Sequence, residues 1–168
     1  MPAYWIQISG ATLLSTTDVA AGSYGESSEK KYGDIDDVQE VHGLVNRFSS
    51  TRLVDKYILD FVSSKPASKV AVVNPPIIYG SGQGPVNHRS VQIPELSRVT
   101  LQNKTGFQVG AGRSAWSNVH VSDLSQIFLL LVENATKGTD GALWDENGLY
   151  FAENGSLVSS ACSKHSSA

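Results

Sequence analysis

Two short runs of apolar, largely β-branched residues constrain the fold most strongly. Tyr4–Ile8 reads Tyr-Trp-Ile-Gln-Ile, and Lys69–Val73 reads Lys-Val-Ala-Val-Val. Each run is bounded by a small-residue or proline-rich turn, which is typical of strands that are buried on both faces. The long segment between them has room for a crossover helix, the connection that parallel strands require. The sequence therefore predicts an α/β fold with a parallel sheet.

The segment between the two strands is predicted to hold a polar loop and then one helix. Residues 20–40 are rich in Gly, Ser and Asp, which indicates a surface loop. Ser49 or Ser50 opens the helix, and residues 63–66 end it. The apolar residues of this helix share one face, which we expect to be buried: Leu53, Val54, Tyr57, Ile58 and Phe61.

The last third of the chain predicts a strand, a long helix and a tail. Ala115–Val121 has strand character, and Asp123 is positioned to cap the following helix, which ends before Gly138. The helix has an apolar stripe on its expected inner face, made by Leu124, Ile127, Phe128 and Leu131. We predict one domain over residues 1–155 and a disordered Ser-rich tail over residues 156–168.

Composition excludes several classes of protein. The single cysteine, Cys162, excludes an internal disulfide and a zinc site built on cysteines. A formal net charge of -3 with no basic run argues against nucleic acid as a partner. The longest apolar stretch, Ile127–Val132, is too short to cross a membrane, and the N-terminus does not resemble a signal peptide. The expected location is cytoplasmic, with no membrane partner.

Two segments carry a resemblance to a known family. Asn74–Gly80 resembles the R-P-x-x-V-Y-G segment of the extended short-chain dehydrogenase/reductase family, the group of NAD-dependent epimerases and dehydratases. Trp116–Leu124 is similar to the V-H-V-x-D-L segment of that family, and Ser9–Thr12 follows the first strand where the family has its catalytic hydroxyl. The resemblance implies part of a doubly wound, Rossmann-like parallel sheet, its C-terminal half, with a small substrate-side subdomain.

The resemblance also implies roles for particular residues. Thr12, or else Ser9, would polarise the carbonyl of a small-molecule substrate. Apart from the resemblance, Trp116 could contact that substrate or pack in the core, and Arg47 could bind it through an anionic group. The segment after the second strand would line the nicotinamide end of NAD or NADP through Asn74, Pro75, Pro76, Ile77 and Tyr79. A purely structural reading stays open for each: small residues that close a strand, prolines that end one, and a tyrosine that turns the chain.

The family's catalytic Tyr-x-x-x-Lys pair is not found. In one register its two positions are Arg47 and Thr51, and in the next they are Phe48 and Arg52. Neither register supplies the phenol that acts as general acid and base. Arg47 or Arg52 could bind an anionic substrate or a cofactor phosphate, although a solvated charge on a helix face is the simpler reading of both.

A Gly-rich loop and a His/Asp pair each have a structural as well as a functional interpretation. No Gly-rich turn of the dinucleotide-binding kind follows the first strand. Gly80, Gly82 and Gly84 could cradle a phosphate, but no helix follows them directly, and a plain turn is the simpler reading. His120 and Asp123 have the spacing of a metal-ligand pair, yet the cap explains Asp123. We therefore predict no metal site.

The sequence thus supports two hypotheses. The chain is a member or fragment of an NAD(P)-dependent oxidoreductase or epimerase family, acting on a carbonyl or sugar-type substrate with its substrate-side half. The alternative is a non-catalytic binding or regulatory protein, or an inactive truncated product. The later motifs favour the first hypothesis, and the missing Tyr/Lys pair favours the second.

One prediction follows from the strand pattern alone. If the first strand lacks a neighbour on one side, its free edge pairs with other chains. We expect the isolated chain to form homo-oligomers or aggregates in size-exclusion chromatography with light scattering. We also expect it to leave the fluorescence of added NADH and NADPH unchanged. A monomer that melts cooperatively and binds either nucleotide at micromolar concentration would contradict this view.

Overall fold

The predicted pair of parallel strands is present in the first sheet. The computed structural model describes residues 2–64, 67–106, 108–138 and 141–158. In it β1 (Tyr4–Ile8), β2 (Lys69–Asn74) and β5 (Leu149–Phe151) form a parallel sheet in the order β1-β2-β5. The chain is therefore a mixed α/β protein, as the sequence predicted.

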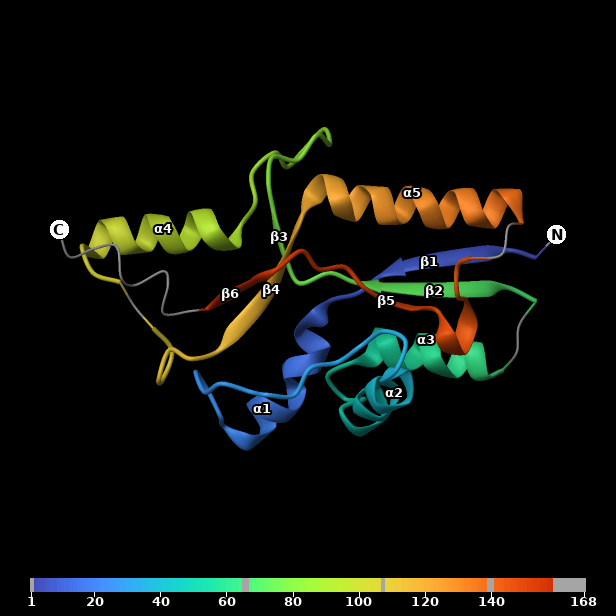
Figure 1. Cartoon of the computed structure of the whole chain (residues 1–168), viewed down its shortest axis with the longest axis horizontal. Helices are drawn as coiled ribbons and strands as arrows, with labels where there is room; N and C mark the ends of the chain where they lie inside the picture. Colours follow the sequence, from blue (N-terminus) through green and yellow to red (C-terminus); the bar gives the residue numbers. More distant parts are fainter. Residues whose placement is uncertain (1, 65–66, 107, 139–140, 159–168) are drawn as a thin grey trace.

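Helices cover both faces of this sheet, which explains why residues 70–73 of β2 are all apolar. Ala71 and Val73 pack with α5 (Val121–Lys137), whereas Val70 lies on the opposite face with α3 (Leu53–Ser63). Figure 1 shows α5 along one side of β1 and β2, with α2 (Val38–Arg47) and α3 on the other side. Because neither face of β2 meets water, its sequence shows no polar alternation.

β1 is the edge strand of the described sheet. The amide of Ser9 donates to the carbonyl of Val73, and Ala3 accepts from the amide of Lys69, so these alternate residues of β1 bond to β2. Successive peptide groups of a strand point to opposite sides. Tyr4, Ile6 and Ile8 therefore direct their N–H and C=O groups away from β2. The free edge assumed in the oligomer prediction is present, while the oligomer itself stays a prediction.

A second, smaller sheet continues the chain beyond β2. β3 (Ile77–Tyr79) pairs in parallel with β4 (Ala115–His120), and β6 (Ser156–Val158) pairs antiparallel with β4. α4 (Gln92–Asn103) lies at the same end of the molecule (Figure 1). Ordered strand thus extends three residues into the predicted tail, whose remaining residues, 159–168, lie outside the described part of the chain.

The polar segment before α3 contains more helix than the sequence predicted. β1 leads into a short 3-10 helix, η1 (Ala11–Ser15), and then α1 (Thr16–Ala21), while α2 begins at Val38 within the predicted loop. α2 buries Val41 and Leu44 against Leu13 of η1. The expectation of a loop up to residue 40 was wrong, because interspersed Gln, Glu, His and Gly hide the i, i+3 spacing of this short helix.

The inner face of α3 also differs from the prediction. Ile58 is buried, but Leu53, Val54 and Tyr57 are 71%, 59% and 64% exposed. The residue that joins Ile58 in the core is Val62, one turn further on. Apolar residues occupy so much of the circumference of α3 that periodicity could identify a helix but not its rotation about its axis.

α5 agrees with its predicted stripe and differs at its start. Leu124 and Leu131 are buried, and Gly138 ends the helix in a left-handed conformation. The N-cap, however, is His120, whose Nδ1 accepts from the amide of Ser122 at 3.3 Å. Asp123 was predicted to be the cap but lies inside the first turn. There its negative charge interacts favourably with the positive end of the helix dipole.

Gly148 and Gly43 give a matched pair for testing these contacts. A Cβ on Gly148 would lie 2.4 Å from the carbonyl oxygen of Val70, whereas one on Gly43 of α2 would meet nothing within 4 Å. We expect Gly148→Ala to lower the free energy of unfolding by about 2–4 kcal/mol, since backbone must move. Gly43→Ala should raise it by about 0.5–1 kcal/mol. Urea unfolding of both variants checks the two signs.

Candidate active site

The turn after β1 and the segment after β2 lie side by side. The carbonyl of Val73 accepts from the amide of Ser9 at 2.8 Å, and the carbonyl of Pro75 accepts from the amide of Ala11 at 3.0 Å. Both segments follow the carboxyl ends of parallel strands, the edge where ligands bind in open α/β sheets. This edge is the candidate active site.

Four polar side chains meet at this edge. Ser9 donates its hydroxyl hydrogen to Oδ1 of Asp55 at 2.5 Å, and Nη2 of Arg52 donates to Oγ1 of Thr12 at 2.7 Å. Nη1 of Arg52 lies 3.7 Å from Oδ2 of Asp55, and the two side chains are 16% and 9% exposed. Arg52 is the N-cap of α3 and Asp55 lies in its first turn, so the start of this helix supplies both charges. We call Ser9, Thr12, Arg52 and Asp55 the hydroxyl cluster.

The hydrogen bonds distinguish the two candidate hydroxyls. A hydroxyl has one hydrogen to donate. Ser9 spends its hydrogen on Asp55, so a further partner can meet Ser9 only as an acceptor. Thr12 accepts from Arg52 and is exposed, and no described residue takes its hydrogen. Thr12 is therefore the hydroxyl free to donate to a substrate oxygen, and the adjacent guanidinium makes it a stronger donor.

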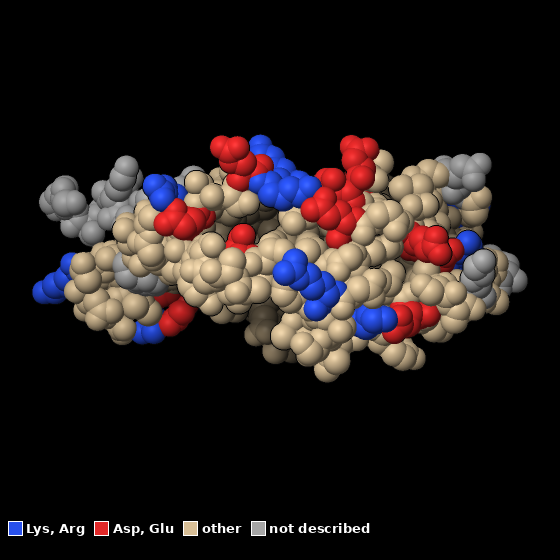
Figure 2. All heavy atoms as spheres, turned by 90° about the horizontal axis from the view of Figure 1, so that it is seen from below, with Lys and Arg blue, Asp and Glu red and all other residues tan. Residues whose placement is uncertain are grey.

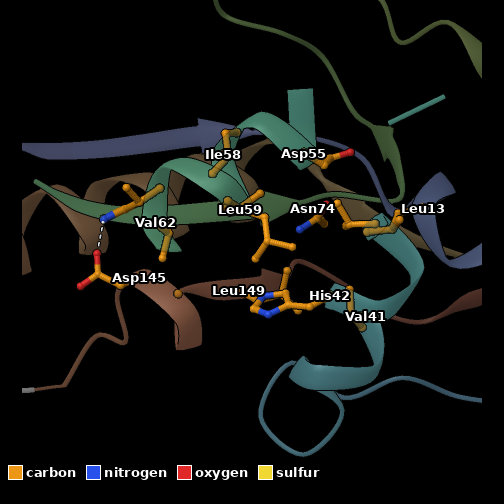
Figure 3. Close-up of a pocket in the computed structure, with 14 residues that line it drawn as sticks. Leu13, Val41, His42, Asp55, Ile58, Leu59, Val62, Asn74, Asp145 and Leu149 are labelled. Atoms are coloured by element: carbon orange, nitrogen blue, oxygen red, sulfur yellow. Dashed lines mark hydrogen bonds between the residues drawn. The ribbon is translucent and has the colours of Figure 1, made fainter. Parts of the chain in front are cut away.

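A cavity of about 40 Å³ lies behind the cluster, between the sheet and helices α2 and α3 (Figure 3). Its wall is mostly aliphatic, with Asp55, His42 and Asn74 among its polar residues. Asn74 is 1% exposed, and both polar atoms of its amide lack a hydrogen-bond partner. An unpaired buried amide destabilises the folded state by about 1–3 kcal/mol. Asn74 is therefore the polar side chain of this cavity that most needs a hydrogen-bond partner.

The remaining predicted site residues lie in other surroundings. Tyr79 stands edge-on to the ring of His120, with ring centroids 5.1 Å apart. Ile77 is the first residue of β3, and Trp116, 44% exposed, belongs to β4 of the second sheet. Arg47 ends α2 with its guanidinium 5.2 Å from the ring centroid of its neighbour Phe48. None of these four has a described hydrogen bond or ring contact to the hydroxyl cluster, and their predicted roles stay predictions.

Two glycines of the Gly-rich loop are explained by packing within the protein. A Cβ on Gly80 would lie 2.3 Å from Nε2 of His120, and one on Gly82 would lie 2.4 Å from the carbonyl oxygen of Asn87. Both glycines are thus required by contacts within the protein. At Gly10, after β1, an added Cβ would have only Thr12 Oγ1 within 4 Å, at 3.7 Å, which is ordinary contact. The plain-turn reading of the Gly-rich loop is the one the packing supports.

The predicted sites missed Asp55 and His42 and placed Arg52 second to Arg47. The signal for Asp55 and Arg52 was present, because both are charged residues at the start of an apolar helix. His42 lies on α2, which the sequence reading took for the edge of a loop. No described group of three or more His, Cys, Asp and Glu side chains is placed to hold a metal ion.

Several charges on the surface form ion pairs. Lys30 bonds Glu40 at 2.6 Å, and Arg113 bonds Glu26. On the face shown in Figure 2, basic and acidic side chains gather in small mixed groups, and uncharged surface separates these groups. Among the described helices, none combines the length and hydrophobicity needed to cross a membrane.

One known protein is similar to this chain over nearly its whole length. The chain is 36% identical over 163 residues to oxidase ucsJ from an Acremonium species. The match covers 92% of this chain and 47% of the relative, so the chain spans about half the length of the curated relative that it matches. No family model and no solved structure matches it.

His42 makes the stability depend on pH in a direction that can be stated. Burial lowers the pKa of His42 below its usual value of 6.5, and the carboxylate of Glu146 opposes this effect. Below pH 6.5 the unfolded chain then binds more protons than the folded chain, so stability falls as the pH falls. Urea unfolding near pH 7.5 and near pH 5.5 should show a smaller loss in His42→Gln than in the native chain.

His88 supplies the control for this measurement. It is exposed on the loop after β3, where its ring bonds the carbonyl of Gly82. His88→Gln should retain the acid loss of the native chain. Equal pH dependence in all three proteins would show that other groups cause the acid loss.

Proposed function

We propose that this chain provides the substrate side of an oxidoreductase site, with Thr12 as the donor to a substrate carbonyl or hydroxyl oxygen. The hydrogen bond from Arg52 to Thr12, which leaves the hydrogen of Thr12 free at an exposed position, carries the proposal. The similarity to a protein named as an oxidase supports the reaction class. A small-molecule substrate of the carbonyl or sugar type follows from the family resemblance.

The chemistry assigned to the cluster is charge stabilisation. As a carbonyl carbon gains electrons, negative charge develops on its oxygen, and a positioned donor stabilises that charge. Thr12 donates to the oxygen, while Arg52 holds the threonine oxygen and keeps its hydrogen directed outward. Asp55 then acts as a positioning residue, because it places Arg52 through their ion contact.

NAD or NADP as the electron carrier is a separate part of the proposal, supported by the family resemblance. The segment from Asn74 to Tyr79 would lie against its nicotinamide end. Gly80 and Gly82 are explained by contacts within the protein rather than by a bound phosphate, so we derive no step through the cofactor. The non-catalytic alternative is favoured by one observation: neither Phe48 nor Arg47 supplies the phenol that the family uses.

Substitution of Thr12 tests the proposed site. We expect Thr12→Val, which keeps the shape and removes the donor, to weaken binding of a carbonyl probe such as cyclohexanone about tenfold. Where a supplied redox cofactor gives measurable turnover, kcat should fall about 10²–10³-fold. Thr12→Ser should retain both properties. Binding is followed by the backbone amide signal of Thr12 in NMR titrations.

Ser9→Ala serves as the comparison, because Ser9 has no free hydrogen. It should keep cyclohexanone binding within a few-fold of the native value. If cyclohexanone does not bind saturably, or if Ser9→Ala is the variant that loses it, the assignment of Thr12 is wrong. Absence of both carbonyl binding and turnover with NADH, NADPH or O₂ as redox partner would favour the non-catalytic alternative.

A further inference from the structure

We propose that the cavity around Asn74 is a binding site for a neutral carboxamide group, and that the Asn74 side chain recognises it. The inference starts from the two unpaired polar atoms of the buried amide. Asn74 continues the face of β2 that carries Val70 and Val72, so its side chain points into the cavity under α2 and α3 (Figure 3). A fully buried amide in that position requires a partner that no described residue supplies.

The chemistry of the amide defines that partner. A primary amide presents a donor and an acceptor side by side. The complementary group presents an acceptor and a donor with the same spacing, as another carboxamide does. Two hydrogen bonds to one planar group would satisfy both atoms of Asn74 at once.

The size of the cavity agrees with such a group. A bound water needs roughly 10–15 Å³ of space measured in this way, so a cavity of about 40 Å³ takes about three heavy atoms. A carboxamide has three: one carbon, one oxygen and one nitrogen. The rest of the ligand must lie outside, through the side of the cavity that is open to solvent.

The charges around the cavity favour a neutral ligand. Asp55 lines the same cavity, and its carboxylate oxygens are held by Ser9 and Arg52 at the hydroxyl cluster. A carboxylate ligand has the same shape as a carboxamide but would bring a second negative charge beside Asp55. A carboxamide avoids this repulsion and offers an N–H group as a donor.

The carboxamide site lies next to the hydroxyl cluster and is distinct from it. Asp55 is shared by the two, and Leu13, the neighbour of Thr12, lies in the cavity wall. A molecule that carries a carboxamide close to a carbonyl could thus reach both. Because the polar atoms of Asn74 are covered, entry requires a shift of a wall side chain such as Leu59, which is seen beside Asn74 in Figure 3.

Acetamide is the probe for the test, with acetate as its isosteric anion. In NMR titrations of the whole chain we expect acetamide to shift the side-chain NH₂ signals of Asn74 saturably, with a Kd of about 1 mM or weaker for so small a ligand. Acetate should bind at least about tenfold more weakly. Nicotinamide separates two sources of the group: tighter binding than acetamide points to a cofactor, and no binding points to a substrate amide.

Two variants keep the proposal falsifiable. Asn74→Leu should abolish the acetamide response, read on the backbone amides of the cavity wall, and should raise Tm by a few degrees because an unpaired amide is removed. Leu59→Phe fills the cavity, retains Asn74 and should weaken acetamide at least about tenfold. No saturable shift in the native chain, equal binding of acetate, or undiminished binding in Asn74→Leu would each overturn the proposal.

Thr12→Val separates this inference from the proposed function. It removes the carbonyl donor but leaves the cavity intact, so acetamide binding should be unchanged while cyclohexanone binding weakens about tenfold. If acetamide binds and cyclohexanone does not, the carboxamide site stands and the oxidoreductase proposal falls. The reverse result would support the hydroxyl cluster alone.

Discussion

The hydrogen bonds between the turn after β1 and the strand that runs beside it are the constraint on which the candidate site depends. They join Ser9 to Val73 and Ala11 to Pro75. The carboxyl ends of parallel strands lie at the same edge of a sheet. These bonds therefore hold the segment after β1 against the segment after β2, although the two are far apart in sequence. The start of α3 then adds Arg52 and Asp55 from a third segment. No local motif could build this arrangement, which arises from the topology of the sheet.

The parts of the fold that the sequence predicted are those whose apolar pattern matches their burial. The short apolar runs of β1 and β2 indicated parallel strands, and residues 70–73 of β2 lie between two layers of helices. α5 was recognised by a stripe that includes Leu124 and Leu131. For α3 the periodicity was correct and the rotation was wrong, because residues such as Leu53 and Tyr57 are apolar on the solvent side. Only the position of the sheet decides which face is inward.

The candidate site was predicted in part for a similar reason. The parallel pairing of β1 and β2 brings Ser9, Thr12 and Asn74 to one edge of the sheet, and their roles there stay predictions. The roles within that edge depend on which hydrogen each hydroxyl donates, and that required knowing where Arg52 and Asp55 lie. The missing hydrogen bonds of Asn74 could not be predicted from the sequence either. The pattern of β2 indicates that the residue is buried, but it does not indicate which groups surround its side chain.

The free edge of β1 determines how the backbone amides of this strand exchange their hydrogen with solvent. Along this strand, the amides that bond to β2 alternate with those of Tyr4, Ile6 and Ile8, which face outward. Exchange of amide hydrogen with deuterium should therefore be slow and fast at alternate residues, a pattern of period two. Any strand that joined this edge would slow the fast set and leave the slow set as it was. The edge strand thus acts as a built-in indicator of whether the sheet ends at β1 or is continued by another segment.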